Sequence, residues 1–567
     1  MGLTSLKDRI KSVRALLREN LPFLLFLSIT VVFFIFKDLD RNLFISCDGL
    51  AYYKHLEEIF IRHEFGRFNR FLPGAALLMS PFFLVTHFFV SLLNPESANG
   101  YTLPYQYTVA LSALFYYSVG ITLTYACLLR FFHRTTAVFT CFAITYGTLL
   151  PAYVHTCWSA YPHVYAFAAC ALFCSLVIYG KDGSQSDFRP SESLFLGLVL
   201  GVVFLIRNTN IIVIFFYLLY GLGQINYKDR LKNILQLRRL SLNALGFLAI
   251  FVLLMLYWHT VTGKLFVDPY SSERFEYIFN PKICEVFFSD AKGLFIFSPI
   301  LIFFFVGFFY GSKFDDINKI KAASLIIFAL ETYIYSAWWC WWLGAGYGER
   351  AFSDILIIFA PIMGAFFEHV FYGKFFGLPH KLLKILIICI SLFFILNNQI
   401  FFTDTMSEAI NINVASWSQL QSSLKHFYGL NGTDWKIENG ENEFTMAEHG
   451  HLFRSHFPQE EGKPYISQRQ GVLLLGPHKR LSKGNYRIVY HYHFNGDKSR
   501  KIVGGAGTYS SENIFDNSKY RVLMEADSTT AVIDNFQLDN DCDDFEFIIY
   551  ALQPGLELDR IVITKLP

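Results

Sequence analysis

Residues 21–36 read LPFLLFLSITVVFFIF, and residues 46–56 read SCDGLAYYKHL. The first stretch is an apolar run without a charged residue, which is typical of a membrane-spanning helix. No small-residue cleavage site follows it, so we predict a retained span and not a cleaved signal peptide. The second stretch then places a carboxylate, Asp48, beyond the end of the span and among aromatic residues. Basic residues precede the run at Lys7, Arg9, Lys11, Arg14 and Arg18.

Apolar runs of similar length recur over the first two thirds of the chain. The 567 residues are 53% hydrophobic and 18% aromatic, and their mean hydropathy is +0.35. One soluble core cannot bury so much apolar surface, so we predict a polytopic α-helical membrane protein over residues 21–400. About eleven spans are expected, at 21–36, 106–129, 136–152, 163–180, 192–207, 210–225, 241–260, 294–311, 321–342, 351–371 and 381–399.

Basic residues between the spans set the predicted orientation. A further apolar stretch, 71–92, would reverse the side of every later loop if it crossed the membrane. If it does not cross, the loops rich in Lys and Arg all lie in the cytoplasm, as the positive-inside rule requires. We therefore predict that 71–92 is re-entrant or interfacial, within a long first external loop at 37–105. Residues 1–20 are then a basic cytoplasmic N-terminus, and the C-terminus is extracytoplasmic.

The C-terminal part of the chain has a different pattern. Residues 471–567 contain short apolar or alternating segments, such as NYRIVYHYHF and DRIVITKL, separated by Gly, Asn, Asp and Pro. This pattern predicts an extracytoplasmic β-sandwich. Its first strands resemble those of carbohydrate-binding jelly rolls, which leaves a glycan-holding role and a purely structural role open. Residues 401–470 are expected to be a connecting region with some helix near 406–426.

Charge and cysteine content argue against other classes of protein. The net charge of +2 gives no reason to expect a nucleic-acid partner. The ten cysteines form no CxxC pair and show no metal-ligand spacing. We therefore predict no metal site and no cofactor. The apolar spans make the lipid bilayer the first expected partner.

The predicted orientation gathers ionisable residues on the external face. Asp48 lies in the first loop, His163 opens a span, Arg207 ends one, Asp290 lies in a long loop, and Arg350 follows a Trp-rich and Gly-rich segment. Ionisable residues at membrane depth are costly and usually functional. Arg207 and Arg350 suit paired hydrogen bonds to a phosphate. Asp48 suits the removal of a proton from a hydroxyl group.

Four of these residues also have a structural explanation. His163 would be a loop histidine whose hydrogen bonds are satisfied. Asp48 would cap the helix predicted after it, because Asp is a favoured N-cap residue. Arg350 would pair with Glu349 or Asp354, and Arg207 would extend to the membrane interface. Tryptophan residues at the end of a span are commonly interfacial anchors.

The segment after Asp48, LAYYKHLEEIFIRHEFG, predicts a helix that lies in the plane of the membrane interface. Its apolar residues recur near helical spacing, and its charged residues fall on the other face. Glu57 and Glu58 are accordingly expected on the solvated side.

Six motifs, in this order, resemble membrane glycosyltransferases of the GT-C fold, the superfamily of protein O-mannosyltransferases and lipid A aminoarabinose transferases. They are DGLAYY, RFNRFLPGAALLMSPFFLVTH, YPHVYAF, LIRNTN, KGLFIFSP and WWLGAGYGER. The resemblance covers residues 20–400. It implies that a sugar moves from a polyprenyl-phosphate-linked donor to a lipid, glycan or protein acceptor, on the extracytoplasmic face of a bacterial inner membrane.

The resemblance also implies roles for individual residues. Asp48 is the expected catalytic base, and Arg350, followed by Arg207, is the expected ligand of the donor phosphate. The Asp-Glu pair of many mannosyltransferases is absent, because Gly49 follows Asp48. The expected substrate contacts are His163, Tyr52, Tyr53, Trp342, Tyr347 and Asp290.

Two other functions remain open. A transporter of lipids or solutes would also have many spans, although transporters more often show repeated halves and broken helices. A non-catalytic scaffold for envelope assembly would share the fold without the chemistry. The substitution Asp48→Asn distinguishes them, because only the enzyme needs that carboxylate to accept a proton.

Overall fold

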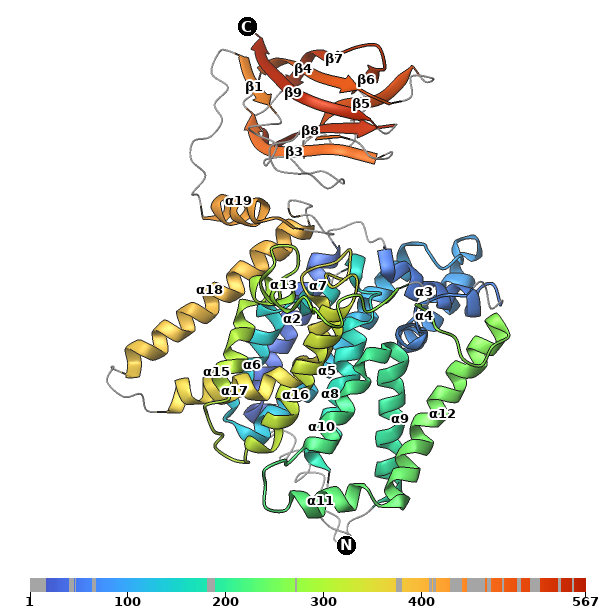
Figure 1. Cartoon of the computed structure of the whole chain (residues 1–567), viewed down its shortest axis with the longest axis vertical. Helices are drawn as coiled ribbons and strands as arrows, with labels where there is room; N and C mark the ends of the chain where they lie inside the picture. The colour runs from blue at the N-terminus through green and yellow to red at the C-terminus, as the bar shows by residue number, and fades with distance from the viewer. Residues whose placement is uncertain are drawn as a thin grey trace. The chain divides into compact units, whose positions relative to one another are not determined.

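The computed structural model divides the chain into two compact units, which are described separately (Figure 1). One unit is Met1–Thr403 with Ile412–Val414, and the other is Asp404–Asn411 with Ala415–Pro567. The residues that the structure describes are 17–39, 45, 47–63, 68–154, 156–180, 189–270, 273–373, 380–406, 410, 415–428, 441–445, 465–466, 471–481, 484–496, 501–509, 521–538, 542–552 and 555–566.

The first unit is helical throughout. Its longer helices are α2 (Leu21–Leu39), α3 (Cys47–Phe60), α4 (Gly74–Leu93), α5 (Leu103–Phe131), α6 (Arg134–Gly147), α8 (His163–Tyr179), α9 (Pro190–Ile206), α12 (Leu237–Thr262), α16 (Asn318–Ala337), α17 (Leu356–Tyr372) and α18 (His380–Met406). Shorter helices are α7 (Leu150–Val154), α10 (Ile214–Leu219), α11 (Tyr227–Ile234), α13 (Ile283–Phe288), α14 (Leu294–Phe297) and α15 (Ile302–Gly307). Short 3₁₀ helices include η4 (Asn208–Val213), η5 (Pro299–Leu301) and η6 (Arg350–Ile355).

Every predicted span contains helix, and two of them are interrupted. The segment 136–152 is divided between α6 and α7, and 294–311 is divided among α14, η5 and α15. Among the described residues, six helices are long and apolar enough to cross a membrane, and four apolar helices are shorter. The predicted polytopic helical class is confirmed, while the number of eleven crossings stays a prediction.

Helix α4 corresponds to the ambiguous stretch 71–92. It is continuous through Pro81, and by length and composition it is one of the six candidate spans. A Cβ at Gly74 would lie 2.4 Å from the backbone of Ile206, at the end of α9. At the other end of α4, the His87 Nδ1 lies 2.7 Å from the hydroxyl of Tyr105, near the start of α5. The end of α9 and the start of α5 both lie beside the start of α8, so these contacts favour the predicted non-crossing helix.

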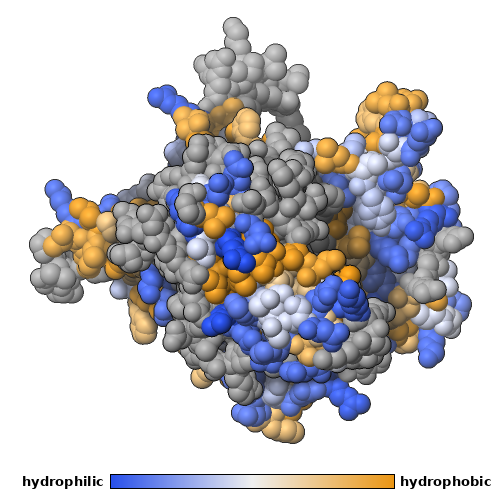
Figure 2. All heavy atoms as spheres, turned by 90° about the horizontal axis from the view of Figure 1, so that it is seen from above, coloured by the Kyte–Doolittle hydropathy of each residue, from blue (hydrophilic) through white to orange (hydrophobic). Residues whose placement is uncertain are grey.

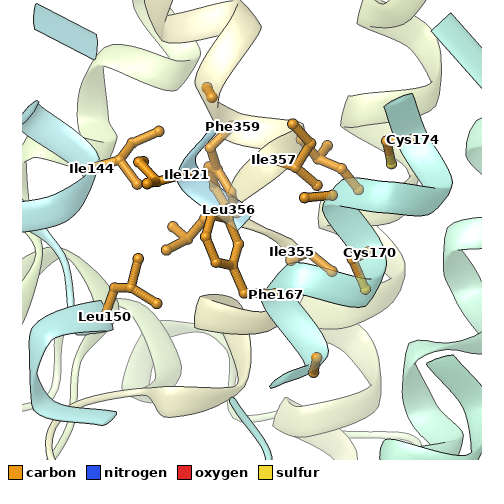
Figure 3. Packing of buried hydrophobic residues seen from close by; sticks show 14 of the residues in the cluster. Ile121, Ile144, Leu150, Phe167, Cys170, Cys174, Ile355, Leu356, Ile357 and Phe359 are labelled. Carbon is orange, nitrogen blue, oxygen red and sulfur yellow. The ribbon is translucent and has the colours of Figure 1, made fainter. Parts of the chain in front are cut away.

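The core of the helical unit is apolar and aromatic. Figure 3 shows side chains of α5, α6, α8 and α17 directed toward one another, among them Ile121, Ile144, Phe167 and Leu356. Helices α9 and α12 approach closely, since a Cβ at Gly197 would lie 2.0 Å from the carbonyl oxygen of Asn243. Small residues allow this kind of helix contact, which is common in membranes.

Large hydrophobic side chains also lie on the surface, mainly on α2, α4, α12 and α18. Figure 2 shows hydrophobic residues at the surface beside hydrophilic ones on the face drawn there. Apolar side chains exposed along whole helices suit contact with lipid tails and not with water.

The second unit contains two antiparallel sheets. Its strands are β1 (Glu441–Thr445), β2 (Tyr465–Ile466), β3 (Gly471–Leu481), β4 (Gly484–Phe494), β5 (Ile502–Tyr509), β6 (Arg521–Glu525), β7 (Thr530–Leu538), β8 (Cys542–Ala551) and β9 (Leu556–Leu566). One sheet has the order β1-β9-β4-β7, with β2 also on β9, and the other has the order β3-β8-β5-β6. This is the strand order of a jelly roll, so the predicted jelly-roll-like sandwich is confirmed.

The boundary predicted at residue 471 is wrong. Strand β1 pairs with β9 from Glu441↔Thr564 to Thr445↔Arg560, so the sandwich takes a strand from the predicted connecting region. The short polar sequence ENEFT carries too little apolar pattern to indicate a strand. Helix α19 (Trp417–Phe427) confirms the helix expected near 406–426.

Candidate active site

A cavity of about 680 Å³ lies at the end of the helical unit where α3 and α8 begin and α9 ends. It brings together five residues from four separate segments of the sequence: Asp48 and Tyr52, His163, Arg207, and Arg350. All five are among the predicted site residues. The motifs that carry them therefore converge on one site, which their order along the chain could not show by itself.

Asp48 and Arg350 form an ion pair in this cavity. The Arg350 Nη2 donates to the Asp48 Oδ2 over 2.7 Å, and the guanidinium lies 5.0 Å from the centre of the Tyr161 ring. The Arg350 side chain is 10% exposed, whereas the Asp48 side chain is 32% exposed. Asp48 lies in the first turn of α3, which begins at Cys47, and so it does not occupy the predicted N-cap position.

A tightly folded loop, Leu343–Glu349, holds Arg350 against Asp48. The Arg350 Nη1 donates to the Ala345 carbonyl and its Nη2 to the Leu343 carbonyl, both over 2.7 Å. Leu343 has a φ of 56°, which is uncommon for a residue with a side chain, and three glycines of the loop also have positive φ. Carbonyl groups converge on the guanidinium because these residues turn the backbone back on itself.

A second charged group surrounds Arg207. Its Nη1 donates to the Asp354 Oδ2 over 2.9 Å, and its Nη2 donates to the Tyr335 hydroxyl over 2.6 Å. The His163 Nδ1 lies 2.8 Å from the other oxygen of Asp354, and the Asn210 side-chain amide donates to Asp354 over 2.8 Å. Asp354 is fully buried, so it holds Arg207 and His163 in place from behind the cavity wall.

Two further ionisable residues lie behind the loop that carries Arg350. The Lys292 Nζ donates to the Gly346 carbonyl, and burial lowers the pKa of Lys292 to about 7. Burial raises the pKa of Glu349 to about 8, although the positive charges of Arg350 and Lys292 act in the opposite direction. Within the described residues, neither carboxylate oxygen of Glu349 has a hydrogen-bond partner. A buried carboxyl of this kind is mostly protonated at neutral pH.

Four other predicted substrate contacts do not line this cavity, and their role stays a prediction. Tyr53 is buried and donates its hydroxyl to the Gly100 carbonyl. Tyr347 is buried and donates to the Asn398 carbonyl over 2.7 Å. Neither Trp342 nor Asp290 lines the cavity.

The cavity also contains residues that the sequence did not single out. Trp338 and Trp339 line it in place of Trp342. At its rim the Arg70 Nη1 donates to Glu273 over 2.6 Å, and the Trp339 Nε1 donates to the same carboxylate over 3.2 Å. These bonds connect the segment before α4 to the loop before α13. Tyr52 is almost fully buried, and burial raises the pKa of its phenol well above the ordinary range, so it is a neutral hydrogen-bonding group.

In the described part of the chain, no group of three or more His, Cys, Asp and Glu side chains is arranged to hold a metal ion. Metal independence stays a prediction. The arrangement places an accessible carboxylate, that of Asp48, in one cavity with the guanidinium groups of Arg207 and Arg350. These groups suit a reaction in which a hydroxyl loses a proton and an anionic group departs.

Neither a protein-family model nor a curated protein matches the chain. Among solved structures, it is similar to ArnT from Cupriavidus metallidurans bound to undecaprenyl phosphate, with a TM-score of 0.42 and 10% identity, over 68% of this chain and 72% of that one. It is also similar to the arabinosyltransferase EmbB from Mycobacterium smegmatis, with a TM-score of 0.29 and 10% identity, over 85% of this chain and 59% of that one.

Proposed function

We propose that this protein is a membrane glycosyltransferase that moves a sugar from a polyprenyl-phosphate-linked donor to a lipid, glycan or protein acceptor. The observation that carries the proposal is the cavity in which Asp48, Arg207 and Arg350 meet at one end of an apolar helical unit. A lipid-linked sugar presents an anionic phosphate beside a reactive carbon at the membrane surface. Arg207 and Arg350 in the cavity carry the charge opposite to that of such a phosphate.

Asp48 is proposed as the general base. Its Oδ2 accepts the hydrogen bond of Arg350, and its Oδ1 has no partner among the described residues. An acceptor hydroxyl that donates to Oδ1 would therefore meet a carboxylate already fixed in direction. Arg350 positions this carboxylate and adds positive charge to the cavity.

Arg207 and Arg350 are proposed to hold the donor phosphate. A guanidinium has five N–H donors, and the contacts of Arg207 to Asp354 and Tyr335 leave others that can face the cavity. The reaction would then be a single inverting displacement. The hydroxyl proton moves to Asp48, the hydroxyl oxygen bonds to the anomeric carbon, and the bond from that carbon to the phosphate oxygen breaks. The lipid phosphate leaves with the electron pair, stabilised by the two arginines.

The proposal is tested by mass spectrometry of glycolipids and envelope glycans from cells that lack the protein. These cells are complemented with the wild type, with Asp48→Asn or with Asp268→Asn at equal membrane abundance. Asp268 is a matched control, because it lines the same cavity and accepts a backbone hydrogen bond from Tyr270 that Asn can also accept. We expect a sugar-sized product with the wild type and Asp268→Asn, and none with Asp48→Asn.

A different result would favour another class of function. If Asp48→Asn restores the product fully, Asp48 has a structural role, and the transporter or scaffold hypothesis replaces the enzyme. If no strain shows a sugar-sized difference, the glycosyltransferase proposal is wrong. Release of undecaprenyl phosphate from a purified lipid-linked sugar provides the direct assay once the sugar is known.

A further inference from the structure

A second cavity, of about 480 Å³, lies at the opposite end of the helical unit. Gly180, after the end of α8, and Arg189, before the start of α9, belong to its lining. The active-site cavity instead contains His163 at the start of α8 and Arg207 after the end of α9. Because α8 has 17 residues, the two cavities are separated by roughly 25 Å along this helix.

The walls of this cavity are amphipathic. Four leucine side chains from three helices contribute to its apolar lining: Leu123 of α5, Leu172 and Leu176 of α8, and Leu196 of α9. At its mouth, Arg189 and Glu192 pair over 3.3 Å, with side chains 65% and 52% exposed. Phe195 and Tyr179 also line the cavity and are about half exposed, so it opens onto the apolar outer surface.

Arg239 is the third charged residue in the described lining of this cavity. Arg239, in the first turn of α12, lines the cavity and is only 4% exposed. Among the described residues that line the cavity, Arg189 and Arg239 are positively charged and Glu192 is negatively charged. On the wall beside it, the Arg230 Nη2 donates to the Tyr217 carbonyl over 2.8 Å, and the Arg230 guanidinium lies 5.5 Å from the centre of the Tyr217 ring.

We infer that this cavity binds an anionic phospholipid, with the headgroup phosphate at Arg239 and an acyl chain along the leucine wall. The cavity has both parts that such a ligand requires: a positive group near a wet mouth and an apolar interior that opens sideways to the bilayer. Basic cavities between membrane helices are known binding sites for anionic lipid headgroups. A free phosphate would use the arginine and leave the leucine wall unfilled. The site is independent of the proposed sugar transfer.

The test uses the full-length protein, purified in detergent and freed of lipid, with binding measured by native mass spectrometry. The probes are phosphatidylglycerol and phosphatidylcholine with the same acyl chains, and glycerol 3-phosphate as the headgroup without a tail. We expect the wild type to retain phosphatidylglycerol at least tenfold better than either of the others. Equal retention of phosphatidylcholine, or equal binding of glycerol 3-phosphate, would overturn the inference.

The neighbouring residue supplies a matched control variant. Arg238 is exposed on the same helix turn, does not line the cavity, and carries the same charge as Arg239. We expect Arg239→Gln to weaken phosphatidylglycerol binding about tenfold and Arg238→Gln to leave it unchanged. Equal effects would mean nonspecific charge attraction and would contradict the site.

If Arg239→Gln does not fold, Ser193→Phe gives a second test, because Ser193 lines the cavity and a ring there would fill it without changing the charge. Undiminished binding by a folded Ser193→Phe protein would also contradict the site.

Discussion

Asp48 in the active-site cavity and Asp354 behind its wall have environments that suit different roles. The Asp48 side chain is about one third exposed, and its Oδ2 accepts the hydrogen bond of Arg350. Asp354 is fully buried and bonded to Arg207, His163 and Asn210. A base must reach its substrate, so Asp48 fits that role, whereas Asp354 can act only through the residues it holds.

We predict that Asp354→Asn destabilises the protein and weakens donor binding at the same time. Removing one partner of a buried ion pair leaves an uncompensated charge and costs about 3–5 kcal/mol. The check is a double-mutant cycle of Asp354→Asn and Arg207→Gln, with unfolding followed in detergent. The double variant should lose less free energy of unfolding than the sum of the two single losses. Strict additivity would show that the two side chains do not interact, and Asp268→Asn serves as the unaffected control.

Glu349 predicts a pH dependence of stability with a definite sign. Its pKa rises from an ordinary 4.5 to about 8 on folding, so between these pH values the folded protein holds a proton that the unfolded chain has lost. The free energy of unfolding therefore falls as pH rises through this window. Lys292 acts in the opposite direction, but only from about pH 7 upward, where its folded form binds fewer protons than the unfolded chain.

Glu349→Gln should remove this dependence. Between pH 5 and pH 7, we expect the melting temperature of the wild type to fall relative to that of Glu349→Gln, so that the gap between them changes steadily with pH. Glu285→Gln is the control, because the Glu285 side chain at the start of α13 is 41% exposed, whereas Glu349 is buried. Parallel curves for the wild type and Glu349→Gln would contradict a protonated, buried Glu349.

At the residue scale, the sequence could identify the ionisable residues but not their partners. Arg350 and Asp354 are four residues apart, a spacing that would allow them to pair on an α-helix. They lie instead on the 3₁₀ helix η6, where three residues make a turn, so Asp354 points in a different direction and meets Arg207. No local pattern showed that Asp48 would be the partner of Arg350, because 302 residues separate them.

At the scale of one element, the helix α3 shows a limit of amphipathic patterns. The apolar face was predicted correctly at Tyr53 and Leu56, which are buried. The prediction that Glu57 and Glu58 are solvated is wrong, since each is only 6% exposed. Glu57 accepts hydrogen bonds from Arg62 and from the Tyr101 hydroxyl, so its face of α3 is covered by the chain segment before α5. A pattern shows which face is polar, but not whether another segment covers it.

The position of α4 gives a prediction at this same scale. If both ends of α4 lie at one side of the membrane, cysteines at Phe68 and Leu93 should react with an impermeant maleimide from the same side. Both positions are exposed, and Ile225, which is fully exposed at the predicted cytoplasmic end of the span 210–225, is the control for the other side. The measurement is labelling of single-cysteine variants in intact cells, in a background without the exposed Cys284 and Cys389. Labelling of only one end would show that α4 crosses the membrane and would reverse the predicted side of every later loop.

At the scale of the whole molecule, the two units follow different rules, and the sequence showed this division clearly. Long apolar runs predicted the helical unit, and short alternating segments predicted the sandwich. Such patterns could not predict the two cavities, because each cavity is built from the ends of several helices. The packing of those helices depends on contacts such as that between Gly197 and Asn243. The order of motifs indicated a shared face, and only the folded helices bring these side chains into one cavity.

The sandwich should fold without the helical unit. Its core is complete in itself, because the buried side chains of β4, β7 and β9 pack with those of β5, β6 and β8. Alternate residues along β4 are fully buried, which fixes the register of this central strand: Tyr486, Ile488, Tyr490 and Tyr492.

We expect a fragment of residues 415–567 to be soluble, with a β-type circular dichroism spectrum and a single cooperative melting transition. A second fragment that starts at Gly471 lacks β1 and β2, which both pair with β9, so it should melt at a lower temperature. Equal melting temperatures would mean that β1 contributes nothing to the sandwich and would restore the boundary at residue 471, whereas a longer fragment that does not melt cooperatively would show that the sandwich depends on the helical unit.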